Sequence, residues 1–279
     1  MKNVVILAGI VTFNPDLERL KENISAITEQ VQQVLIVDNG SNNILEIKLM
    51  VKKFDPKIRI IEFKNNLGIA AALNVIGDYA VGKGFDYFLT LDQDSVSLPG
   101  VIEEFKKYLY LPKVGLLNTY HIDRNRNDSK IPNAEVIEEP EMITSGSLMS
   151  TSLFAKGFKY DSDLFIDKVD FDLNIRLISA GYHLYQIPYY GLLHELGEMS
   201  ERRFLFWRVS THNHSAFRRY YMSRNAIIMF KKYGVTNVNL KLLRADIIKI
   251  IKTLLYEKDK KNKIKNIIKG YIDGLGYKN

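Results

Sequence analysis

Apolar residues in the first third of the chain follow two alternating patterns. Short runs of aliphatic and aromatic residues, too short for helices, predict buried strands. They lie at residues 4–11, 34–37, 58–63 and 87–91. Between these runs, apolar residues recur at helical spacing and predict helices over residues 17–30, 45–51 and 69–81. Strands alternating with helices in this way predict an α/β fold with a mainly parallel sheet.

Segments that contain polar side chains follow each predicted strand at its carboxyl end. They are Thr12-Phe13-Asn14, Asp38-Asn39, Asn65-Asn66 and Asp92-Gln93-Asp94. In open parallel sheets, ligands bind beyond the carboxyl ends of the strands. The four segments therefore predict one shared ligand site.

Asp92 and Asp94 directly follow the fourth strand, so a tight turn can bring their side chains to one point. Two carboxylates at one point repel each other unless a cation lies between them. Hard oxygen ligands of this kind suit Mg²⁺ or Mn²⁺, and such a cation can hold a diphosphate. The alternative interpretation is that both residues only shape a turn.

Other residues near the strand ends each have a binding role and a structural alternative. Asp38 can accept the imide N–H of a uracil or thymine ring, or it can form an Asx turn. Asn66 and Gly68 precede a helix whose free N–H groups favour a phosphate, or they simply cap that helix. Asn74 is unusual inside an Ala-rich helix and is either a ligand contact or a solvent-facing residue.

Two segments in the middle of the chain differ in character. Residues 123–141 are polar and predict a surface hairpin or loop. Residues 142–152 are small and hydroxyl-rich and predict a strand. Gly146 would let a ligand approach the backbone of that strand closely; a plain buried strand is the alternative.

An acidic segment at residues 165–172 leads a predicted helix that Gly181 ends. Asp167 fits the N-cap of this helix, with Asp170 as its capping partner. Three acids within six residues exceed the need of one cap, so Asp170 is also a candidate general base. His194 follows a further predicted strand at 185–193 and is either structural or a third ligand of a carboxylate-bound cation.

Composition narrows the possible partners and compartments. The formal net charge of +7 admits nucleic acid, an anionic membrane surface or a phosphorylated ligand as a partner. Cysteine is absent, which excludes disulfides and thiolate metal sites and fits a reducing, cytoplasmic compartment. No uninterrupted apolar run reaches about 18 residues, so we expect no transmembrane helix. The apolar start reads as the first strand rather than as a signal peptide.

Residues 201–279 predict a helical, basic C-terminal region after a first domain at 1–200. Segments 202–208 and 217–221 interleave cations with aromatic residues, which suits an acceptor cleft, a membrane interface or a homodimer contact. No nucleic-acid module surrounds them, so we expect no nucleic-acid partner. An amphipathic stripe at 240–256 predicts a helix. It either packs on the body with a solvated basic face or attaches peripherally to an anionic bilayer.

The order and spacing of several short motifs resemble one enzyme family. The motifs are Val-Thr-Phe-Asn-Pro, Val-Asp-Asn-Gly-Ser, Asn-Asn-Leu-Gly-Ile-Ala-Ala-Ala-Leu-Asn and Leu-Asp-Gln-Asp-Ser, followed by the acidic helix start. From residue 4 to about residue 197, the chain resembles the inverting family 2 glycosyltransferases. The resemblance implies the GT-A fold, a mixed, mainly parallel Rossmann-like sheet flanked by helices, and a nucleotide-sugar donor.

The same resemblance implies roles for individual residues. Asp92, Asp94 and His194 would hold Mg²⁺ or Mn²⁺. Asp170 would be the catalytic base, although Val169 stands where the family usually has Glu. The implied nucleotide-sugar contacts are Thr12, Phe13, Asn14, Asp38, Asn39, Asn66, Gly68, Asn74, Asp92, Gln93, Gly146 and Arg224.

More specific motifs resemble the rhamnosyltransferase subgroup and, more distantly, galactofuranosyltransferases. They are Phe-Ile-Asp-x-Val-Asp at 165–170, a later His-x-x-Gly, and Tyr-Tyr-Met-Ser-Arg-Asn at 220–225. They imply dTDP-L-rhamnose as the donor, with a UDP-sugar as the alternative. The acceptor would be a saccharide or polyprenyl-linked hydroxyl in cell-surface polysaccharide synthesis, at the inner face of the membrane.

Two other function classes fit parts of the chain. Sugar nucleotidyltransferases usually carry a Gly- and Arg-rich loop after strand one, which Thr12-Phe13-Asn14-Pro15 does not supply. A non-catalytic nucleotide- or membrane-binding module is suggested by the charge alone. That class leaves the ordered carboxylates at the strand ends unexplained.

Overall fold

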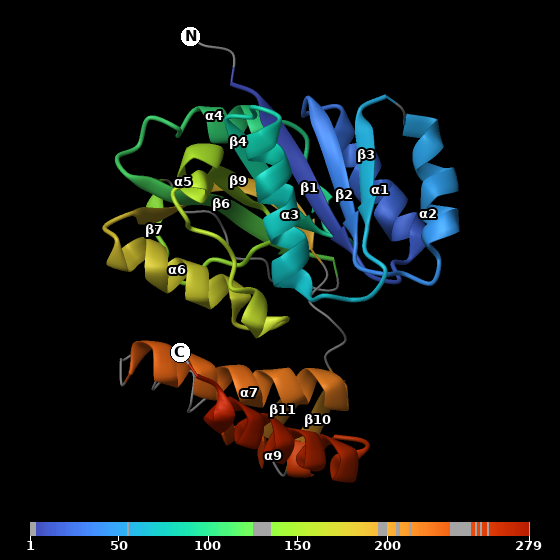
Figure 1. Cartoon of the computed structure of the whole chain (residues 1–279), viewed down its shortest axis with the longest axis vertical. Helices are drawn as coiled ribbons and strands as arrows, with labels where there is room; N and C mark the ends of the chain where they lie inside the picture. The colour runs from blue at the N-terminus through green and yellow to red at the C-terminus, as the bar shows by residue number, and fades with distance from the viewer. Residues whose placement is uncertain are drawn as a thin grey trace. The chain divides into compact units, whose positions relative to one another are not determined.

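The fold is that of a computed structural model, which describes residues 4–54, 56–124, 135–194, 200–204, 207–211 and 214–234. Towards the C-terminus it describes residues 247–248, 250–251, 253–255 and 257–278. The chain divides into two compact units (Figure 1). The first comprises Met1–Asp163 and Val169–Glu195, and the second comprises Leu164–Lys168 and Leu196–Asn279.

The first unit begins with the alternation of strands and helices that the sequence predicts. Its elements in order are β1 (Ile6–Thr12), α1 (Leu17–Thr28), β2 (Gln33–Asp38), α2 (Ile44–Val51), the 3₁₀ turn η1 (Lys52–Phe54), β3 (Ile58–Glu62), α3 (Ile69–Gly82) and β4 (Tyr87–Asp92). Asp16 caps α1 by accepting a hydrogen bond from the backbone N–H of Arg19, as expected for an N-cap aspartate.

The later elements of the first unit complete its sheet. They are β5 (Val96–Ser97), α4 (Val101–Lys106), β6 (Val114–Asp123), β7 (Ile137–Glu138), β8 (Ser147–Ser150), α5 (Thr151–Ala155), the 3₁₀ turn η2 (Ser162–Leu164), α6 (Val169–Ser179) and β9 (His183–His194). Within the described residues, nine strands form one sheet in the order β3-β2-β1-β4-β8-β6-β9-β5, with β7 paired to β9. The first four strands are parallel, whereas β8 runs antiparallel to both β4 and β6.

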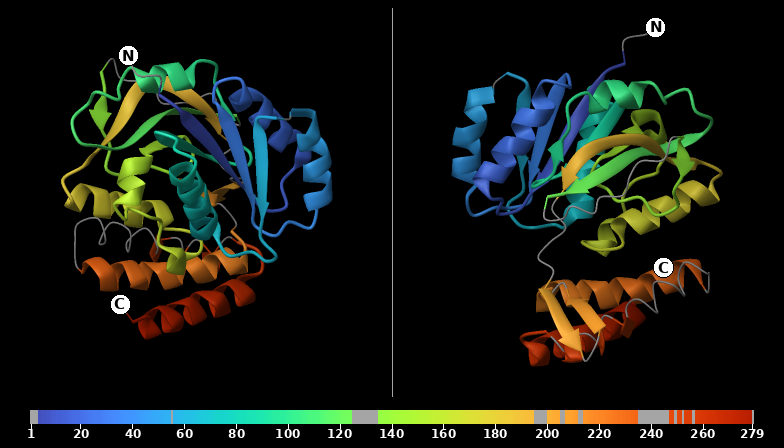
Figure 2. Two further views of the ribbon diagram at one scale, coloured as in Figure 1. Left: turned by 45° about the horizontal axis from the view of Figure 1, so that its top comes forward. Right: turned by 180° about the vertical axis from the view of Figure 1, so that it is seen from behind.

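Helices cover both faces of this sheet, and the alternation of side chains along β1 shows how. Ile6, Ala8 and Ile10 belong to a core cluster that also contains Leu20, Ile24 and Ile27 of α1. Gly9 faces the other way, because a Cβ atom there would lie only 2.3 Å from Ile76 of α3. Successive strand residues point to opposite faces, so α1 and α3 lie on opposite sides of the sheet (Figures 1 and 2).

The middle of the chain differs from the sequence-based expectation. A strand was expected over residues 142–152, but β8 covers only Ser147–Ser150, and α5 begins directly at Thr151. Gly146 has a φ of +78°, which lies in the left-handed region that favours glycine and is incompatible with a continuous strand. Of the polar segment 123–141, residues 125–134 lie outside the described part of the chain.

The second unit contains a hairpin and two long helices. Strands β10 (Ser200–Phe204) and β11 (Trp207–Thr211) pair antiparallel. Helices α7 (Ala216–Tyr233) and α9 (Lys260–Gly276) pack closely, because Gly270 and Gly274 face α7. A Cβ atom on Gly270 would lie 2.3 Å from the carbonyl oxygen of Tyr220, so the helices could not approach this far with a larger residue.

The C-terminal region is therefore helical, as predicted, apart from the hairpin. Within segment 202–208, the described residues 202–204 and 207–208 belong to β10 and β11 rather than to a helix. Aromatic and β-branched residues such as Phe204, Trp207 and Val209 favour strands, and this preference outweighs the helical reading of the segment. Of the amphipathic stripe at 240–256, residues 240–246, 249, 252 and 256 lie outside the described residues. Among the helices described, none is long and apolar enough to cross a membrane.

Candidate active site

The register of the parallel strands brings the predicted strand ends to one edge of the sheet. Thr12 pairs with Asp38 across β1 and β2, and Val11 pairs with Asp92 across β1 and β4. At the opposite end of the strand order, Val96 of β5 pairs with Leu193 of β9. That antiparallel pairing places the residues just before β5 beside the end of β9, although they are about 100 residues apart in sequence.

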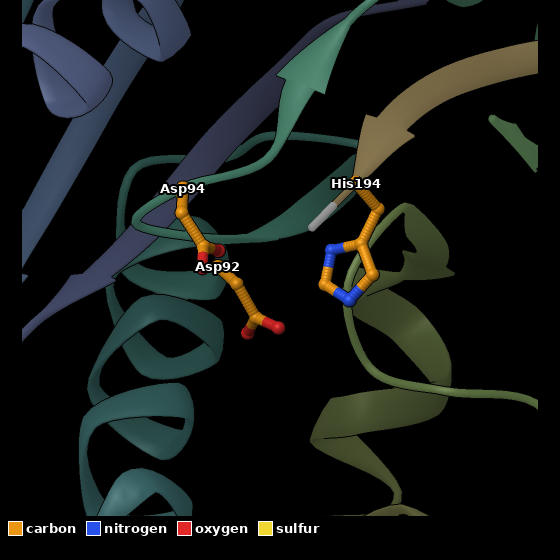
Figure 3. A group of neighbouring side chains, drawn as sticks. All are labelled: Asp92, Asp94 and His194. Carbon is orange, nitrogen blue, oxygen red and sulfur yellow. The ribbon is translucent and has the colours of Figure 1, made fainter. Parts of the chain in front are cut away.

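Asp92, Asp94 and His194 converge at this edge (Figure 3). Each residue offers one ligand atom, and these atoms all lie within 4.8 Å of one another. All three side chains are half-buried. Two carboxylates and an imidazole are a donor set that fits a divalent cation such as Mn²⁺ or Mg²⁺. The structure thus brings together the three residues expected to bind the metal.

A chain of hydrogen bonds joins the backbone of Asp92 to the ring of His194. The N–H of Asp92 donates to Ser145 Oγ at 3.0 Å, and Ser145 Oγ donates to Ser95 Oγ at 2.9 Å. Ser95 Oγ lies 2.9 Å from His194 Nδ1. In addition, Asn23 of α1 donates to the carbonyl of Asp92 at 2.7 Å. These bonds hold the backbone of Asp92 in place and orient the ring of His194.

His121 of β6 lies beside the candidate metal site. Its ring centroid is 6.2 Å from that of His194, and its Nε2 is 3.2 Å from Oδ1 of the buried Asn118. Burial, together with the nearby His194, lowers the pKa of His121 to about 4. His121 is therefore neutral at physiological pH and adds no positive charge that would repel a cation.

Asp38 forms the Asx turn that was the structural alternative to base recognition. Its carboxylate is buried and accepts hydrogen bonds from four donors. Thr12 Oγ1 and Ser41 Oγ donate to Oδ1, and the N–H groups of Gly40 and Ser41 donate to Oδ2. Four donors occupy the four lone-pair positions of a carboxylate, so an imide contact would require one of them to leave.

The neighbouring strand-end residues form a connected loop network. The N–H of Phe13 donates to Gln93 Oε1 at 2.8 Å, which links the end of β1 to the Asp-Gln-Asp turn. Asn14 adopts a left-handed φ of 47°, and its side-chain oxygen accepts a hydrogen bond from the N–H of Asn42. Asn39 accepts from the N–H of Leu67 at 2.8 Å. The loops after β1, β2, β3 and β4 therefore support one another.

The residues at the start of α3 have structural partners. Asn66 Oδ1 accepts a hydrogen bond from the N–H of Gly68 at 2.9 Å, and Gly68 precedes the helix with a φ of 88°. Asn74 is half-buried, and its side chain bonds to the backbone of Tyr160. Its amide oxygen accepts from the N–H of Tyr160 and its Nδ2 donates to the carbonyl of Tyr160, both at 2.8 Å. These bonds tie α3 to the segment before η2, and a ligand contact by Asn74 stays a prediction.

Asp170 lies in the first turn of α6, close to a buried tyrosine. Burial raises the pKa of Tyr160, a hydrogen bond with the side chain of Thr90 opposes that shift, and the charge of Asp170 raises the pKa further. Thr90 belongs to β4 and precedes Asp92 by two residues. Tyr160 therefore lies within electrostatic reach of Asp170 and contacts β4, the strand that ends at the candidate metal ligand Asp92.

The other two acids of the 165–172 segment have different surroundings. Asp172 is fully buried and pairs with Nε of Arg176 at 2.9 Å, which is a structural ion pair. The prediction of Asp167 as N-cap is wrong, because α6 begins at Val169 and Lys168 directly precedes it. Asp167 and Lys168 both have a left-handed φ, at 70° and 64°. The catalytic role expected for Asp170 stays a prediction.

Comparison with known proteins settles the family. A family model described as "Glycosyl transferase family 2" matches residues 8–158, more than half of the chain. The chain belongs to glycosyltransferase family 2. The dTDP-rhamnosyl transferase RfbF of Shigella flexneri is 31% identical over 292 residues, covering 98% of this chain and 96% of that protein. An uncharacterized glycosyltransferase of Haemophilus influenzae is 31% identical over 114 residues, 39% of this chain and 34% of that protein.

Solved structures agree on the fold. The structure of S. aureus TarS 1–349 has a TM-score of 0.60 and 11% identity, covering 98% of this chain and 81% of that chain. The same protein in complex with UDP gives a TM-score of 0.61 at 10% identity. At such identities the likeness shows the fold alone, which is the GT-A fold. Family 2 glycosyltransferases often use a divalent metal, and the Asp92–Asp94–His194 cluster is a possible site for one.

Several residues of this glycosyltransferase site were not predicted from its sequence. Ser95, Ser145 and Asn23 orient the candidate ligands, and Tyr160 lies near Asp170. Ser95 directly follows the Asp-Gln-Asp motif, and Ser145 lies in the hydroxyl-rich run at 142–152. Their positions next to these motifs are the sequence signal for both residues. Arg224 belongs to α7 in the second unit, where its guanidinium donates to Asn225 Oδ1 at 3.2 Å.

Proposed function

We propose that this family 2 glycosyltransferase is a metal-dependent, inverting rhamnosyltransferase. It transfers L-rhamnose from dTDP-L-rhamnose to a hydroxyl group of a saccharide or lipid-linked acceptor. The observation that carries the proposal is the convergence of Asp92, Asp94 and His194 at the carboxyl edge of the sheet. The similarity of nearly the whole chain to a protein named dTDP-rhamnosyl transferase supports the choice of donor.

The candidate metal ligands fit the binding of a nucleoside diphosphate. Asp92, Asp94 and His194 would hold Mg²⁺ or Mn²⁺, and Ser95 and Ser145 keep two of these ligands in place. These residues would hold a divalent cation that, when bound, would supply Lewis-acid stabilisation of the negative charge on the leaving diphosphate. Without a cation, Asp92 and Asp94 would repel the diphosphate, so we expect donor binding to depend on metal.

Asp170 is the proposed general base. The acceptor hydroxyl attacks the anomeric carbon of the donor on the face opposite the nucleotide, and the bond from that carbon to the diphosphate oxygen breaks. The proton of the hydroxyl passes to the Asp170 carboxylate, and the configuration at the anomeric carbon inverts. A positioned base of this kind typically contributes about 10²–10⁴-fold to the rate.

The nucleoside is proposed to lie along the loops after β1 and β2, at Thr12, Phe13, Asn14 and Asn39. Asp38 orders these loops through its four hydrogen bonds, and its direct contact with the base stays a prediction. Gln93, Asn66, Gly68 and Gly146 line the path proposed for the diphosphate and the sugar. A diphosphate contact by Arg224 also stays a prediction.

Thermal denaturation with a panel of ligands tests this proposal. The protein is heated with Mg²⁺ or Mn²⁺ and with dTDP, dTDP-L-rhamnose, UDP or UDP-sugars, and in each case with a chelator instead of metal. A ligand that binds only the folded state raises stability by RT ln(1 + [L]/Kd). We expect a metal-dependent rise in Tm with dTDP and dTDP-L-rhamnose, and we expect Asp94→Ala to abolish it.

The other outcomes separate the parts of the proposal. A response to UDP compounds alone would keep the metal site and replace rhamnose by another sugar, such as a galactofuranosyl or hexosyl group. An equal response in the chelator would contradict metal dependence. Asp16→Ala is a suitable control for the loss of a carboxylate, because Asp16 only caps α1; it should lower the Tm without changing the ligand response.

A further inference from the structure

Helix α9 already has a buried face, which packs against α7. The residues of this face recur at helical spacing: Lys263, Ile267, Gly270 and Gly274. Lys263 is buried with its charge satisfied, because its Nζ lies 2.9 Å from Glu257, which also pairs with the buried Arg219. This face therefore accounts for the attachment of α9 within the second unit.

The same helix carries a second apolar face that is exposed. Ile264, Ile268, Ile272 and Leu275 follow one another at intervals of four, four and three residues, so they lie on one side of the helix. Ile268, Ile272 and Leu275 are 53%, 62% and 64% exposed. A helix that needed only to pack on α7 would carry polar residues at these positions.

The preceding helical segment extends this apolar surface. Five of its large aliphatic side chains are each about half exposed: Ile247, Ile248, Ile251, Leu254 and Leu255. Leu254 comes together with Ile264 and Ile268 of α9 at a groove of about 550 Å³. Contiguous apolar surface of this kind on a folded protein marks an interaction site more often than scattered exposed residues do.

Lysines border the apolar surface. Lys260, Lys261 and Lys265 line the same groove as Leu254, Ile264 and Ile268. Residues 257–278 contain seven lysines and three acidic residues. Of the acids, Glu257 is buried with Lys263 and Arg219, and Asp273 accepts a hydrogen bond from the hydroxyl of Tyr220 at 2.7 Å. The third, Asp259, is exposed and accepts a hydrogen bond from Nδ2 of Asn262 at 2.8 Å, and it is outnumbered by the three lysines that line the groove. The exposed rim of the groove is therefore basic.

We propose that this surface, formed by Ile247, Ile248, Ile251, Leu254, Leu255 and the exposed face of α9, docks the enzyme onto an anionic lipid bilayer. An apolar helical face bordered by lysines is the pattern of helices that lie in the membrane interface. A second copy of the chain would also cover the apolar residues, but it would bring two rows of lysines together. The basic rim matches anionic lipid headgroups instead.

This inference does not depend on the identity of the sugar donor. Combined with the proposed function, it favours an acceptor that is carried on a lipid, because docking would place the enzyme where such an acceptor lies. Liposome binding involves no nucleotide sugar and the thermal assay involves no lipid. Failure of one proposal is therefore distinguishable from failure of the other.

Flotation of the full chain with liposomes tests the proposal. Vesicles of phosphatidylcholine alone are compared with vesicles that also contain phosphatidylglycerol, at low and high salt. We expect binding to the anionic vesicles only, weakened by salt through screening. Lys261→Gln and Lys265→Gln each remove one positive charge and should each weaken binding to anionic vesicles about fivefold. Ile268→Glu should abolish this binding.

Matched variants on the first unit serve as controls. Leu49 of α2 is 62% exposed and Lys52 is also exposed, so Leu49→Glu and Lys52→Gln should leave liposome binding unchanged. The proposal is overturned if Ile268→Glu binds like the wild type or if neutral and anionic vesicles bind equally. It is also overturned if the wild type is a lipid-independent dimer that Ile268→Glu converts into a monomer.

Discussion

The Oγ atom of Ser95 lies 2.9 Å from Nδ1 of His194 and also accepts a hydrogen bond from Ser145. In the tautomer with a proton on Nδ1, the ring donates to Ser95 and keeps the lone pair of Nε2 for a cation. Partners of this kind orient metal-binding histidines and raise their affinity for the metal. The serine that follows the Asp-Gln-Asp motif thus supports the third candidate ligand.

We predict that Ser95→Ala weakens Mn²⁺ binding about 10- to 100-fold, because His194 loses the partner that orients its ring. Calorimetric titration of Mn²⁺ in the presence of dTDP measures this change. Ser95→Thr keeps the hydroxyl and should bind nearly as the wild type does. Ser97→Ala is a matched control on β5, since the buried Ser97 hydroxyl has no hydrogen-bond partner among the described residues. Equal affinities for Ser95→Ala and Ser97→Ala would contradict the role of Ser95.

Asn225 of α7 holds the short segment that leads into α6. Its Nδ2 donates to the carbonyls of Leu164, Ile166 and Asp167 at 2.7, 2.8 and 2.9 Å, and the side chain is fully buried. Phe165, Asp167 and Lys168 in this segment have left-handed φ values, and such strain persists only where the surroundings enforce it.

Asn225→Ala should therefore lower stability by about 1–3 kcal/mol, because it removes the side-chain donor that three backbone carbonyls share. Hydrogen exchange should show faster exchange of the amides in residues 164–168, alongside a lower Tm. Asn225→Asp should be at least as harmful, since a carboxylate faces the same carbonyl oxygens. Asn266→Ala removes a surface amide contact on α9 and should change stability little. Unchanged exchange in residues 164–168 of Asn225→Ala would contradict this account.

Two glycines on α3 should respond in opposite ways to alanine. At Gly77, a Cβ atom would lie 2.4 Å from the ring of Phe154, which packs edge-on against Phe88. Gly77→Ala should therefore destabilise the protein by about 1–3 kcal/mol through overpacking. At Gly82 nothing lies within 4 Å of the added atom, so Gly82→Ala should stabilise by up to about 1 kcal/mol. Urea denaturation measures both effects, and equal signs for the two variants would contradict the packing described for Phe154.

His121 predicts a pH dependence of stability in the metal-free protein. Burial holds its pKa near 4, below the ordinary value of 6.5, so the unfolded chain binds a proton between these values that the folded chain does not. The free energy of unfolding is therefore highest above pH 6.5, and it falls by about 3 kcal/mol in all as the pH drops towards 4. His121→Gln should flatten this part of the stability profile, measured in chelator. A variant that keeps the full slope would show that another group causes it.

The sequence was sufficient to predict the alternation of strands and helices and the strand-end segments that the register aligns. Those features depend on local patterns, which short windows contain. The approach of His194 to Asp92 and Asp94 depends on the pairing of β5 with β9, about 100 residues apart. The local pattern left His194 as either a structural residue or a third ligand. Only the resemblance to a family assigned it to the metal site.

Other features escaped prediction for physical reasons. A sequence window cannot show that the carboxylate of Asp38 is saturated by four donors, because the donors include Thr12 of another strand. Nor can it show that Asn74 binds the backbone of Tyr160, 86 residues away. The left-handed backbone at Asp167 and Lys168 moved the start of α6, and only the contacts of Asn225 explain how that backbone is held.

The most direct test of the proposed chemistry is the rate of dTDP release from dTDP-L-rhamnose, with water or a supplied acceptor as the attacking group. The wild type is compared with Asp170→Asn, with and without Mn²⁺, and Asp163→Asn serves as a control at a nearby exposed acid. We expect release that requires metal, that Asp163→Asn preserves, and that Asp170→Asn slows by about 10²–10⁴-fold while dTDP still binds. Release at the wild-type rate by Asp170→Asn, or undiminished release in chelator, would contradict the account.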